Sequence, residues 1–413
     1  MATERVLIYS QAFFPDHSGI PIYSSDFAFY CSENGYDVDV ITGFPFYPQW
    51  EKRKEDKGKL FAKETVKGIS IYRGYLYVAK NPTSFQRILH ELTLVLFALL
   101  NSFRVKRPDI IVVFTTPVLL GVIAAFMNLF WKRKLVINVQ DFQVEAAYSL
   151  GMLKGSTVLH IINKIEIWSY KQAHHVSSIS NSMTQLLIDR KKIDHTKVIL
   201  WPNWLHVKES KSDFPEKGLF RQKFGISQDS FLVAYAGNIG KKQGLEILVD
   251  IATKFSVRPD LLFLIIGEGS GLESLKAYAA KLGVENVLFL PFLNAQEYKE
   301  YLVDVDAIFI SQMKIPFDVY FPSKLLGIMS VGQLLIISAD QNSELYKVMK
   351  KNNLALVADY DDTDTLKEHI DTAIGNCSKV KEYKTESVKF IDQYDRELVL
   401  SNFLKSLKNL SQN

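Results

Sequence analysis

The chain has 413 residues, of which 47% are hydrophobic and 23% are charged, and its formal net charge is +4. This length is too great for one compact core, so two domains are expected, and the small positive charge favours anionic partners but is too weak to indicate nucleic acid binding. The two cysteines, Cys31 and Cys377, lie far apart in the sequence. They argue against a disulfide framework or a cysteine-based metal site and fit a reducing compartment. The apolar run near the N-terminus is too short for a secretory signal, so secretion is not expected.

The first half of the chain predicts alternating strands and helices. Residues 5–10 predict a short apolar strand, followed by a loop that contains Gly19, a helix that Gly35 ends, and a second strand at 37–43. This order is a βαβ unit, which implies a parallel sheet. Further strands of this half are predicted at 134–141, 174–180 and 198–204.

Two segments raise the question of membrane contact. Residues 110–131 carry no charge and are long enough to span a bilayer, but Thr115-Thr116-Pro117 divides them into a predicted buried strand and a helix. The preceding segment, 86–107, has an apolar centre between basic ends, which is typical of a helix in the membrane interface; a helix that covers a sheet is the alternative. The candidate cations for membrane or acceptor contact are Arg87, Arg104, Lys106, Arg107, Lys132 and Arg133.

The second half repeats the α/β pattern after a polar stretch at 206–217, where we place the linker. Residues 231–255 predict a strand, a glycine-rich turn and a helix, and residues 260–283 repeat this order. Additional strands are predicted at 286–293, 306–313, 333–340 and 354–360. Two doubly wound halves predict two Rossmann-like domains, in which ligands bind beyond the carboxyl ends of the strands.

We therefore expect three parts of the chain. Residues 1–204 form a first Rossmann-like domain, residues 218–385 a second, and residues 386–413 a helical tail.

Glycine-rich turns follow the first two strands of the second half. The glycines at 237, 240 and 244 do not have the G-x-G-x-x-G spacing of a dinucleotide site, so NAD binding is not predicted. With Lys241 and Lys242 this turn could face a phosphate, although an ordinary strand-to-helix turn would look the same. Gly267-Glu268-Gly269 could likewise admit a ligand close to the backbone or form a tight turn.

One aspartate and two pairs of aspartates invite a catalytic or metal-binding interpretation. Asp141 comes directly after a buried strand, where a carboxylate can bind hydroxyl groups or act as an acid or base, and where it can also cap a helix. The Asp-x-Asp pairs at 37–39 and 304–306 could in principle bind Mg²⁺. Both occur where the chain enters a strand and no other oxygen cluster supports them, so no metal site is predicted.

Lys324 is an unusual residue for the start of a helix. It lies in "FPSKLLGIMSVG", residues 321–332, in which Ser323 and Lys324 precede an apolar helical run. The N-terminus of a helix favours anions, so a lysine there either contacts a bound anion or is an ordinary surface residue.

Seven motifs together resemble a known enzyme family. They are "SGIPIYSSDFA", "PFYPQW", "VQDFQVEAAYSLG", "WPNW", "AGNIGKKQGLE", "IGEGSGLE" and "FPSKLLGIMSVG". In this order they resemble family-4 retaining glycosyltransferases of the GT-B fold, in particular the subgroup of colanic acid and aminosugar transferases that builds bacterial capsule, O-antigen and exopolysaccharide repeats.

The resemblance implies an α/β GT-B architecture, with two Rossmann-like doubly wound domains facing across a cleft and C-terminal helices that pack back on the first. It implies a nucleotide diphosphate-sugar donor, a UDP-sugar rather than a GDP-sugar, carrying an N-acetylated aminosugar or a deoxysugar. The acceptor would be a polyprenyl-diphosphate-linked saccharide at the cytoplasmic face of the inner membrane, and no metal cofactor is expected. The enzyme would be cytoplasmic and peripherally attached to that membrane.

The turn and strand-end positions, together with the resemblance, give the candidate site residues. Asp141 and Lys324 are the catalytic candidates, with Lys324 stabilising the charge of the leaving diphosphate. The donor-binding candidates are Gly19, Asn238, Gly240, Lys242, Gln243, Gly267, Glu268, Pro291, Phe292, Ser323 and Lys324.

Four positions depart from the family pattern. Asn238 and Gln243 stand where many members have an arginine and a lysine, Gly327 where many have a ribose-binding glutamate, and Gln140 where many have a histidine. Two other functions therefore remain possible: a sugar-nucleotide epimerase of similar shape, and a non-catalytic scaffold of a polysaccharide assembly complex.

Overall fold

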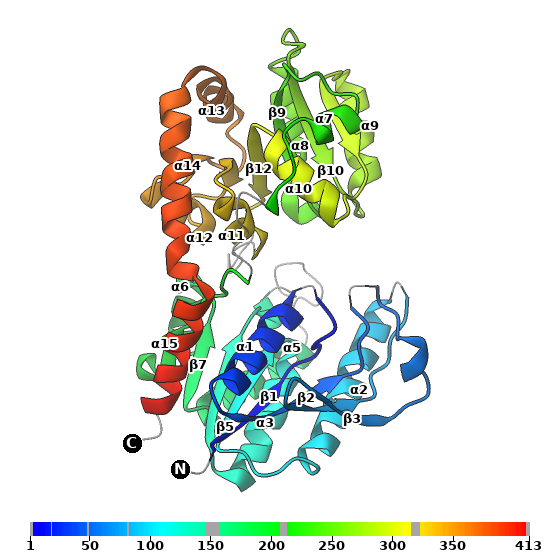
Figure 1. Ribbon diagram of the computed structural model, residues 1–413, viewed down its shortest axis with the longest axis vertical. Coiled ribbons are helices and arrows are strands. Elements are labelled where there is room, and N and C mark those ends of the chain that lie inside the picture. Colours follow the sequence, from blue (N-terminus) through cyan, green and yellow to red (C-terminus); the bar gives the residue numbers. More distant parts are fainter. Residues whose placement is uncertain are drawn as a thin grey trace. The chain divides into compact units, whose positions relative to one another are not determined.

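The chain folds into two compact units (Figure 1). The computed structural model describes residues 3–17, 19–47, 49–80, 82–145, 157–206, 213–314 and 323–409. Unit 1 consists of Met1–His206 with Tyr394–Asn413, and unit 2 consists of Val207–Gln393. The division at residue 206 falls where the predicted linker starts. The tail expected from residue 386 is divided between the two units.

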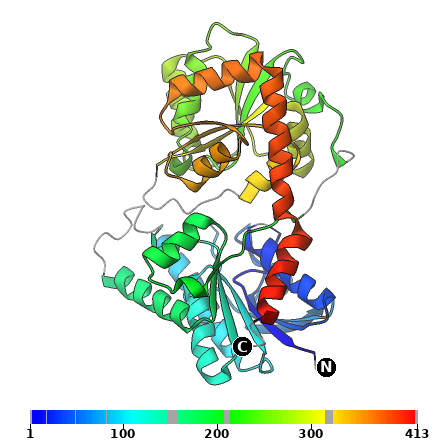
Figure 2. The same cartoon turned by 90° about the vertical axis from the view of Figure 1, so that its left-hand side faces the viewer.

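Unit 1 is built on an eight-stranded sheet with the order β3-β4-β2-β1-β5-β6-β7-β8. Its strands are β1 (Arg5–Tyr9), β2 (Asp37–Gly43), β3 (Phe61–Val66), β4 (Ile69–Gly74), β5 (Ile110–Thr115), β6 (Lys134–Val139), β7 (His175–Ser178) and β8 (Val198–Leu200). All neighbours are parallel except β3 and β4. In the centre, Val6 of β1 lies between Val38 of β2 and Ile110 of β5. β1 and β5 are almost continuous apolar runs, as expected for strands of a sheet that helices cover on both faces (Figures 1 and 2). β2 differs, because it carries Asp37 and Asp39.

The helices of unit 1 are α1 (Ile20–Glu33), α2 (Ser84–Ser102), α3 (Val118–Trp131), α5 (Thr157–Gln172), α6 (Asn181–Asp189) and α15 (Arg396–Asn409). A capping box starts α2, because the Thr83 hydroxyl accepts from the Gln86 amide and the Gln86 side chain accepts from the Thr83 amide. The uncharged segment 110–131 forms strand β5 and helix α3, as its Thr-Thr-Pro break predicts. No helix in the described part of the chain is long and apolar enough to cross a membrane.

An aromatic cluster attaches the C-terminal helix to unit 1. Phe403 of α15 stacks on Trp201 with ring centroids 3.4 Å apart, and Trp201 also contacts Phe27 of α1. Figure 2 shows α15, in red, beside the blue helix α1. The C-terminal helix α15 thus packs back on the N-terminal domain, as the resemblance implies.

Unit 2 has a six-stranded, fully parallel sheet with the order β11-β10-β9-β12-β13-β14. Its strands are β9 (Phe231–Ala236), β10 (Leu261–Ile266), β11 (Val287–Leu290), β12 (Ala307–Gln312), β13 (Leu334–Ala339) and β14 (Leu356–Ala358). Its helices are α7 (Leu219–Lys223), α8 (Glu246–Thr253), α9 (Leu272–Leu282), α10 (Ala295–Asp304), α11 (Ser323–Ser330), α12 (Glu344–Lys351), α13 (Thr363–Gly375) and α14 (Cys377–Ile391). This is the 3-2-1-4-5-6 order of the doubly wound Rossmann fold, so the predicted fold class is confirmed.

Candidate functional site

The topology of unit 2 places its candidate residues where the strands end, at the carboxyl-terminal side of the sheet. Strand order reverses between β9 and β12, and the crevice at such a switch point is where doubly wound sheets bind ligands. The turn 237–244 follows β9, the turn 267–271 follows β10, and the backbone of Ser323 begins α11 after β12.

The two glycine turns are joined through their backbones. The amide of Ile239 donates to the carbonyl of Glu268 at 2.8 Å, and the amide of Gly271 donates to the carbonyl of Ile239 at 2.9 Å. A Cβ atom on Gly267 would overlap the Gly237 carbonyl oxygen, and one on Gly269 would overlap that of Ile239. Both glycines also have positive φ angles, +135° and +154°. The close contact of the two turns therefore explains these two glycines.

Gln243 carries, at this end of the sheet, a buried side-chain oxygen to which no described residue donates a hydrogen bond. It ends the 3₁₀ turn Lys241–Gln243, and its buried Oε1 accepts no hydrogen bond within the part of the chain that the structure describes. A buried unsatisfied polar atom costs about 1–3 kcal/mol, so it indicates a position where a ligand can donate a hydrogen bond. The Gln243 amide donates to the Gly240 carbonyl at 3.1 Å, which fixes the turn itself.

The other donor-binding candidates of unit 2 expose their side chains at the same end of the sheet. Asn238, Lys242 and Glu268 are exposed. Pro291 and Phe292 follow β11, and the Phe292 side chain is 66% exposed. The Lys242 carbonyl accepts from the Met313 amide at 3.1 Å, which connects the turn after β9 to the end of β12.

The positions around Lys324 are only partly described. Residues 315–322 and the side chains of Ser323 and Lys324 lie outside the described part, so their assignment stays a prediction. Gly327, where the family often has glutamate, sits within α11, and a Cβ atom there would meet open space. A side chain would therefore fit at this position.

In unit 1, Asp141 lies exposed just beyond β6. It follows Gln140, whose side chain belongs to a network of amides. The Nε2 of Gln140 donates to the Oδ1 of Asn138 at 2.5 Å, and Gln140 and Asn203 exchange two hydrogen bonds at 3.1 and 3.2 Å. Gln143 donates to Glu91, whose burial raises its carboxyl pKa. Sequence reasoning missed Asn203, although "WPNW" contains it, because its partner lies 63 residues away.

The two Asp-x-Asp pairs have structural partners. Arg5 bonds Asp37 and contacts Asp39, while Arg221 bonds Asp306 at 2.9 Å and donates its amide to Asp304 at 3.1 Å. Ion pairing and hydrogen bonding therefore explain both motifs.

Comparison with known proteins covers both units. The family model described as "Glycosyltransferase Family 4" matches residues 17–209. The family model described as "Glycosyl transferases group 1" matches residues 216–389. The chain belongs to the family-4 glycosyltransferases of the GT-B fold.

Individual relatives agree with this placement. The glycosyltransferase is 27% identical over 420 residues to the putative colanic acid biosynthesis glycosyl transferase WcaI of Escherichia coli K12, covering 98% of this chain and 100% of that one. Its fold is similar to sucrose-phosphate synthase from Thermosynechococcus elongatus, with a TM-score of 0.73, 14% identity and 99% of each chain covered. It is also similar to Anabaena HepE in complex with UDP-glucose, with a TM-score of 0.69, 14% identity and coverage of 98% and 99%.

The cations predicted to contact a membrane do not all lie together in this glycosyltransferase. Arg107 donates to the carbonyl of Trp131 at 3.1 Å, so the C-terminal ends of α2 and α3 are adjacent. These ends carry Arg104, Lys106, Arg107, Lys132 and Arg133. Arg87 lies at the other end of α2, about 25 Å along the helix from Arg104, where its guanidinium is 5.8 Å from the Trp50 ring. The predicted set is therefore one basic cluster and one separate arginine.

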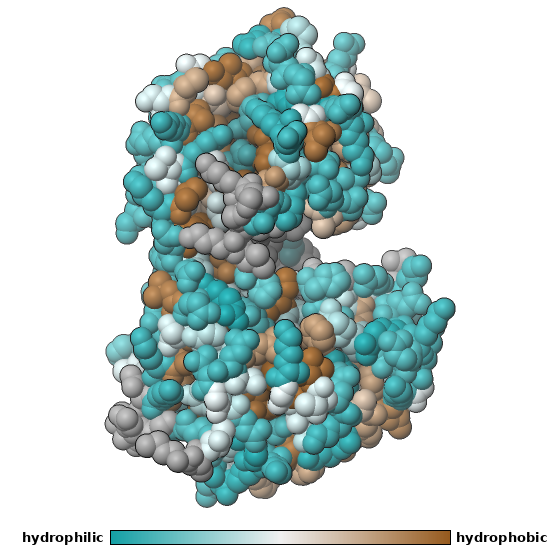
Figure 3. All heavy atoms as spheres, in the orientation of Figure 1, coloured by the Kyte–Doolittle hydropathy of each residue, from teal (hydrophilic) through white to brown (hydrophobic). Residues whose placement is uncertain are grey.

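Exposed apolar side chains run along the same two helices. We call them the α2–α3 surface: Phe85, Ile88, Leu92, Leu96, Leu100, Phe103, Phe126, Leu129 and Phe130. On α2 they recur every three or four residues, which places them on one face. Hydrophobic residues interrupt the hydrophilic exterior of unit 1 in Figure 3. A contiguous exposed apolar face next to a basic cluster is typical of an interaction surface.

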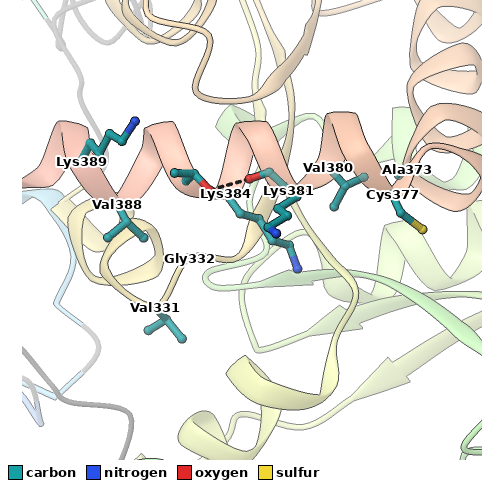
Figure 4. Close-up of a pocket in the computed structure, with 10 residues that line it drawn as sticks. Val331, Gly332, Ala373, Cys377, Val380, Lys381, Lys384, Val388 and Lys389 are labelled. Atoms are coloured by element: carbon teal, nitrogen blue, oxygen red, sulfur yellow. Dashed lines mark hydrogen bonds between the residues drawn. The ribbon is translucent and has the colours of Figure 1, made fainter.

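A separate pocket of about 560 Å³ lies in unit 2 beside α14 (Figure 4). Its lining includes Val331, Gly332, Val380 and Val388, with Lys384 half-buried among them. Burial lowers the pKa of Lys384. None of the predicted site residues lines this pocket, so sequence reasoning gave no sign of it.

Proposed function

We propose that this glycosyltransferase moves a sugar from a UDP-sugar bound by unit 2 to a polyprenyl-diphosphate-linked saccharide bound by unit 1. The observation that carries the proposal is the switch point of unit 2, where the turn at 237–244 presents the unsatisfied Oε1 of Gln243. A donor hydroxyl or base N–H would satisfy that atom. The GT-B neighbour HepE, whose complex contains UDP-glucose, supports a uridine donor.

The proposed chemistry is charge stabilisation at the leaving group. Cleavage of the glycosidic bond leaves negative charge on the diphosphate, and Lys324 with the amides that begin α11 would stabilise it. Attack from the same face, assisted by the leaving phosphate, would retain the configuration of the sugar. Asp141 would bind the acceptor hydroxyl or accept its proton.

The proposed pathway is the assembly of a bacterial capsule, O-antigen or exopolysaccharide. The similarity to the putative colanic acid transferase over its full length supports this setting. The α2–α3 surface and its basic cluster support attachment to the cytoplasmic face of the inner membrane, where anionic headgroups would meet the cations. The transferred sugar is proposed to be an N-acetylated aminosugar or a deoxysugar.

A donor screen tests this function. UDP- and GDP-sugars are compared for thermal stabilisation of the full chain, because a specific ligand at 100 times its Kd stabilises by about 2.7 kcal/mol. The best donor is then incubated with and without lipid-linked acceptor, and the anomeric configuration of the product is determined by NMR. We expect a UDP-sugar to stabilise and to be transferred with retention. Conversion of the donor in the absence of acceptor would instead support an epimerase, and binding without turnover would support a scaffold.

A further inference from the structure

A second pocket lies at the switch point of the unit 1 sheet. It has a volume of about 280 Å³ and lies where the chain leaves β1, β2 and β5, the central strands of that sheet. Its lining residues are Gln11, Ala12, Gly19, Ile20, Pro21, Phe46, Tyr47, Trp50 and Thr116. This is the position at which a doubly wound sheet binds ligands. The "PFYPQW" motif, to which the sequence assigned no role, supplies three of these residues.

The aromatic wall of this pocket is held in a strained conformation. Trp50 has φ +52°, which a bulky residue rarely adopts. Its ring centroid lies 5.4 Å from Phe46 and 5.3 Å from His90. Strained residues cluster at ligand sites because surrounding contacts hold them there. The position of the Trp50 side chain is therefore fixed by its neighbours.

Buried polar groups hold the loops that form the pocket. The carboxylate of Asp16, which is buried, accepts from the amide of Phe46 at 3.4 Å. Arg73, which is 1% exposed, donates to the carbonyls of Phe14 at 2.6 Å and Gly43 at 3.3 Å. These contacts connect the loop after β1 to the loop after β2, so hydrogen bonds within the protein hold both walls of the pocket.

The polar side of the pocket is oriented by a buried histidine. The Nδ1 of His90 lies 2.6 Å from the Tyr77 carbonyl, which can only accept, so Nδ1 carries the proton and Nε2 accepts from the Gln11 amide at 2.8 Å. Burial lowers the pKa of His90 and keeps the ring neutral. The Gln11 side chain is thereby fixed at the pocket, where Thr116 adds a hydroxyl.

The lining does not suit a phosphate. It contains no charged side chain, and Pro21 removes one of the amide N–H groups that the first turn of α1 could offer an anion. Gly19, which the resemblance assigns to the donor, also lies in this lining, and its donor contact stays a prediction. The volume of about 280 Å³ is just below the range of about 300–1,000 Å³ typical of pockets for drug-sized ligands, which suits a small ligand. An aromatic face with amide and hydroxyl groups beside it matches one uncharged ring that has an apolar face and hydroxyl edges.

We propose that this pocket binds a neutral pyranose ring, stacked on Trp50 with its hydroxyls at Gln11 and Thr116. The identity of this ring rests on the proposed function: it is a sugar of the acceptor saccharide. The pocket then selects the acceptor by its sugar, separately from the donor contacts of unit 2.

Saturation-transfer NMR on the full chain tests the proposal without requiring turnover. The probes are methyl pyranosides of glucose, galactose, fucose and N-acetylglucosamine, with inorganic diphosphate as an anionic probe and UDP as the probe of unit 2. We expect at least one pyranoside to receive saturation from aromatic protons. Its affinity should fall at least tenfold in Trp50→Ala and in Gln11→Ala, and be largely kept in Trp50→Phe. UDP binding should be unchanged in all three.

The control is Phe61→Ala, which removes a partly exposed aromatic ring of the edge strand β3 and should change neither ligand. Melting curves identify a variant that does not fold; if Trp50→Ala fails, Gln11→Ala decides. Absence of pyranoside binding, an unchanged affinity in the variants, or displacement of the sugar by diphosphate would each overturn the proposal. A protein that binds a pyranoside through Trp50 but transfers no sugar would contradict the proposed function alone.

Discussion

Lys324 is the residue on which the proposed chemistry most depends. Its backbone lies in the first turn of α11, where the helix dipole already favours an anion. Lys324→Ala should lower kcat for sugar transfer by about 10²-fold or more, because a charged donor to the leaving diphosphate is lost. The measurement is initial rates with a saturating UDP-sugar.

The matched control is Lys276→Ala, which removes an exposed lysine of α9 that pairs with Glu273 at 3.1 Å. It should leave the rate almost unchanged. Equal turnover in Lys324→Ala and the wild type would show that another group stabilises the diphosphate.

Gly269 belongs to a motif that the sequence singled out, but a tertiary contact explains why this residue is glycine. The sequence could not decide between ligand approach and a tight turn, because the overlapping atom, the Ile239 carbonyl oxygen, lies on another turn. Gly269→Ala should reduce the free energy of unfolding by about 3 kcal/mol, through strain and overpacking. Urea unfolding followed by circular dichroism measures this.

Gly375→Ala provides the comparison, since this glycine is at the end of α13 and a Cβ atom there meets nothing. It should be neutral, or stabilise by up to about 1 kcal/mol. If the two alanine variants unfold at the same urea concentration, the contact between the turns does not require glycine.

At the scale of elements, the helices α2 and α3 carry the features expected of membrane attachment. The double variant Lys106→Gln/Lys132→Gln removes two exposed cations of the basic cluster. Each cation near an anionic surface contributes about 1 kcal/mol, so partitioning into phosphatidylglycerol vesicles should weaken by about 30-fold. Co-sedimentation measures it, and binding to neutral vesicles should not change.

Lys405→Gln/Lys408→Gln, on the exposed side of α15, is the control with the same change in net charge. If both double variants lose the same affinity, net charge accounts for the binding and the α2–α3 surface does not direct it.

The same elements show how far the sequence could predict the fold. Residues 110–131 were divided correctly into strand and helix, because a buried parallel strand is a short apolar run and Thr-Thr-Pro breaks the pattern. The antiparallel strands β3 and β4, residues 61–74, had no prediction, since β3 is an exposed edge strand with polar residues. Strand order and the Gln140–Asn203 pair depend on contacts distant in sequence, which periodicity does not encode.

At the scale of the whole molecule, a buried carboxylate of α1 binds the C-terminal helix to the rest of unit 1. Asp26 of α1 accepts from Arg396 of α15 at 2.7 and 2.9 Å, and from the Trp204 indole at 2.6 Å. His206 lies 3.1 Å from the same carboxylate. Residues from three distant parts of the sequence therefore meet at one charge, and its protonation should weaken the attachment of α15.

The sign of the pH dependence follows from the pKa of Asp26. Burial alone would raise this pKa, but the hydrogen bonds from His206, Arg396 and Trp204 outweigh burial and lower it to about 2. Since an unfolded aspartate titrates near pH 3.9, this group contributes roughly 2 kcal/mol above about pH 4, and the contribution is lost as the pH falls towards 2. Unfolding free energies between pH 2 and 6, followed by the fluorescence of Trp201 and Trp204, measure the loss.

Asp26→Asn should remove this part of the pH dependence and destabilise unit 1 at pH 6 by about 3 kcal/mol, because Arg396 loses its buried partner. Glu397→Gln is the matched control: Glu397 bonds the same arginine at 2.6 Å, but its side chain is 66% exposed. An exposed pair contributes at most about 1 kcal/mol, so this variant should keep the acid transition of the wild type. A wild-type acid transition in Asp26→Asn would show that other carboxylates control the attachment of α15.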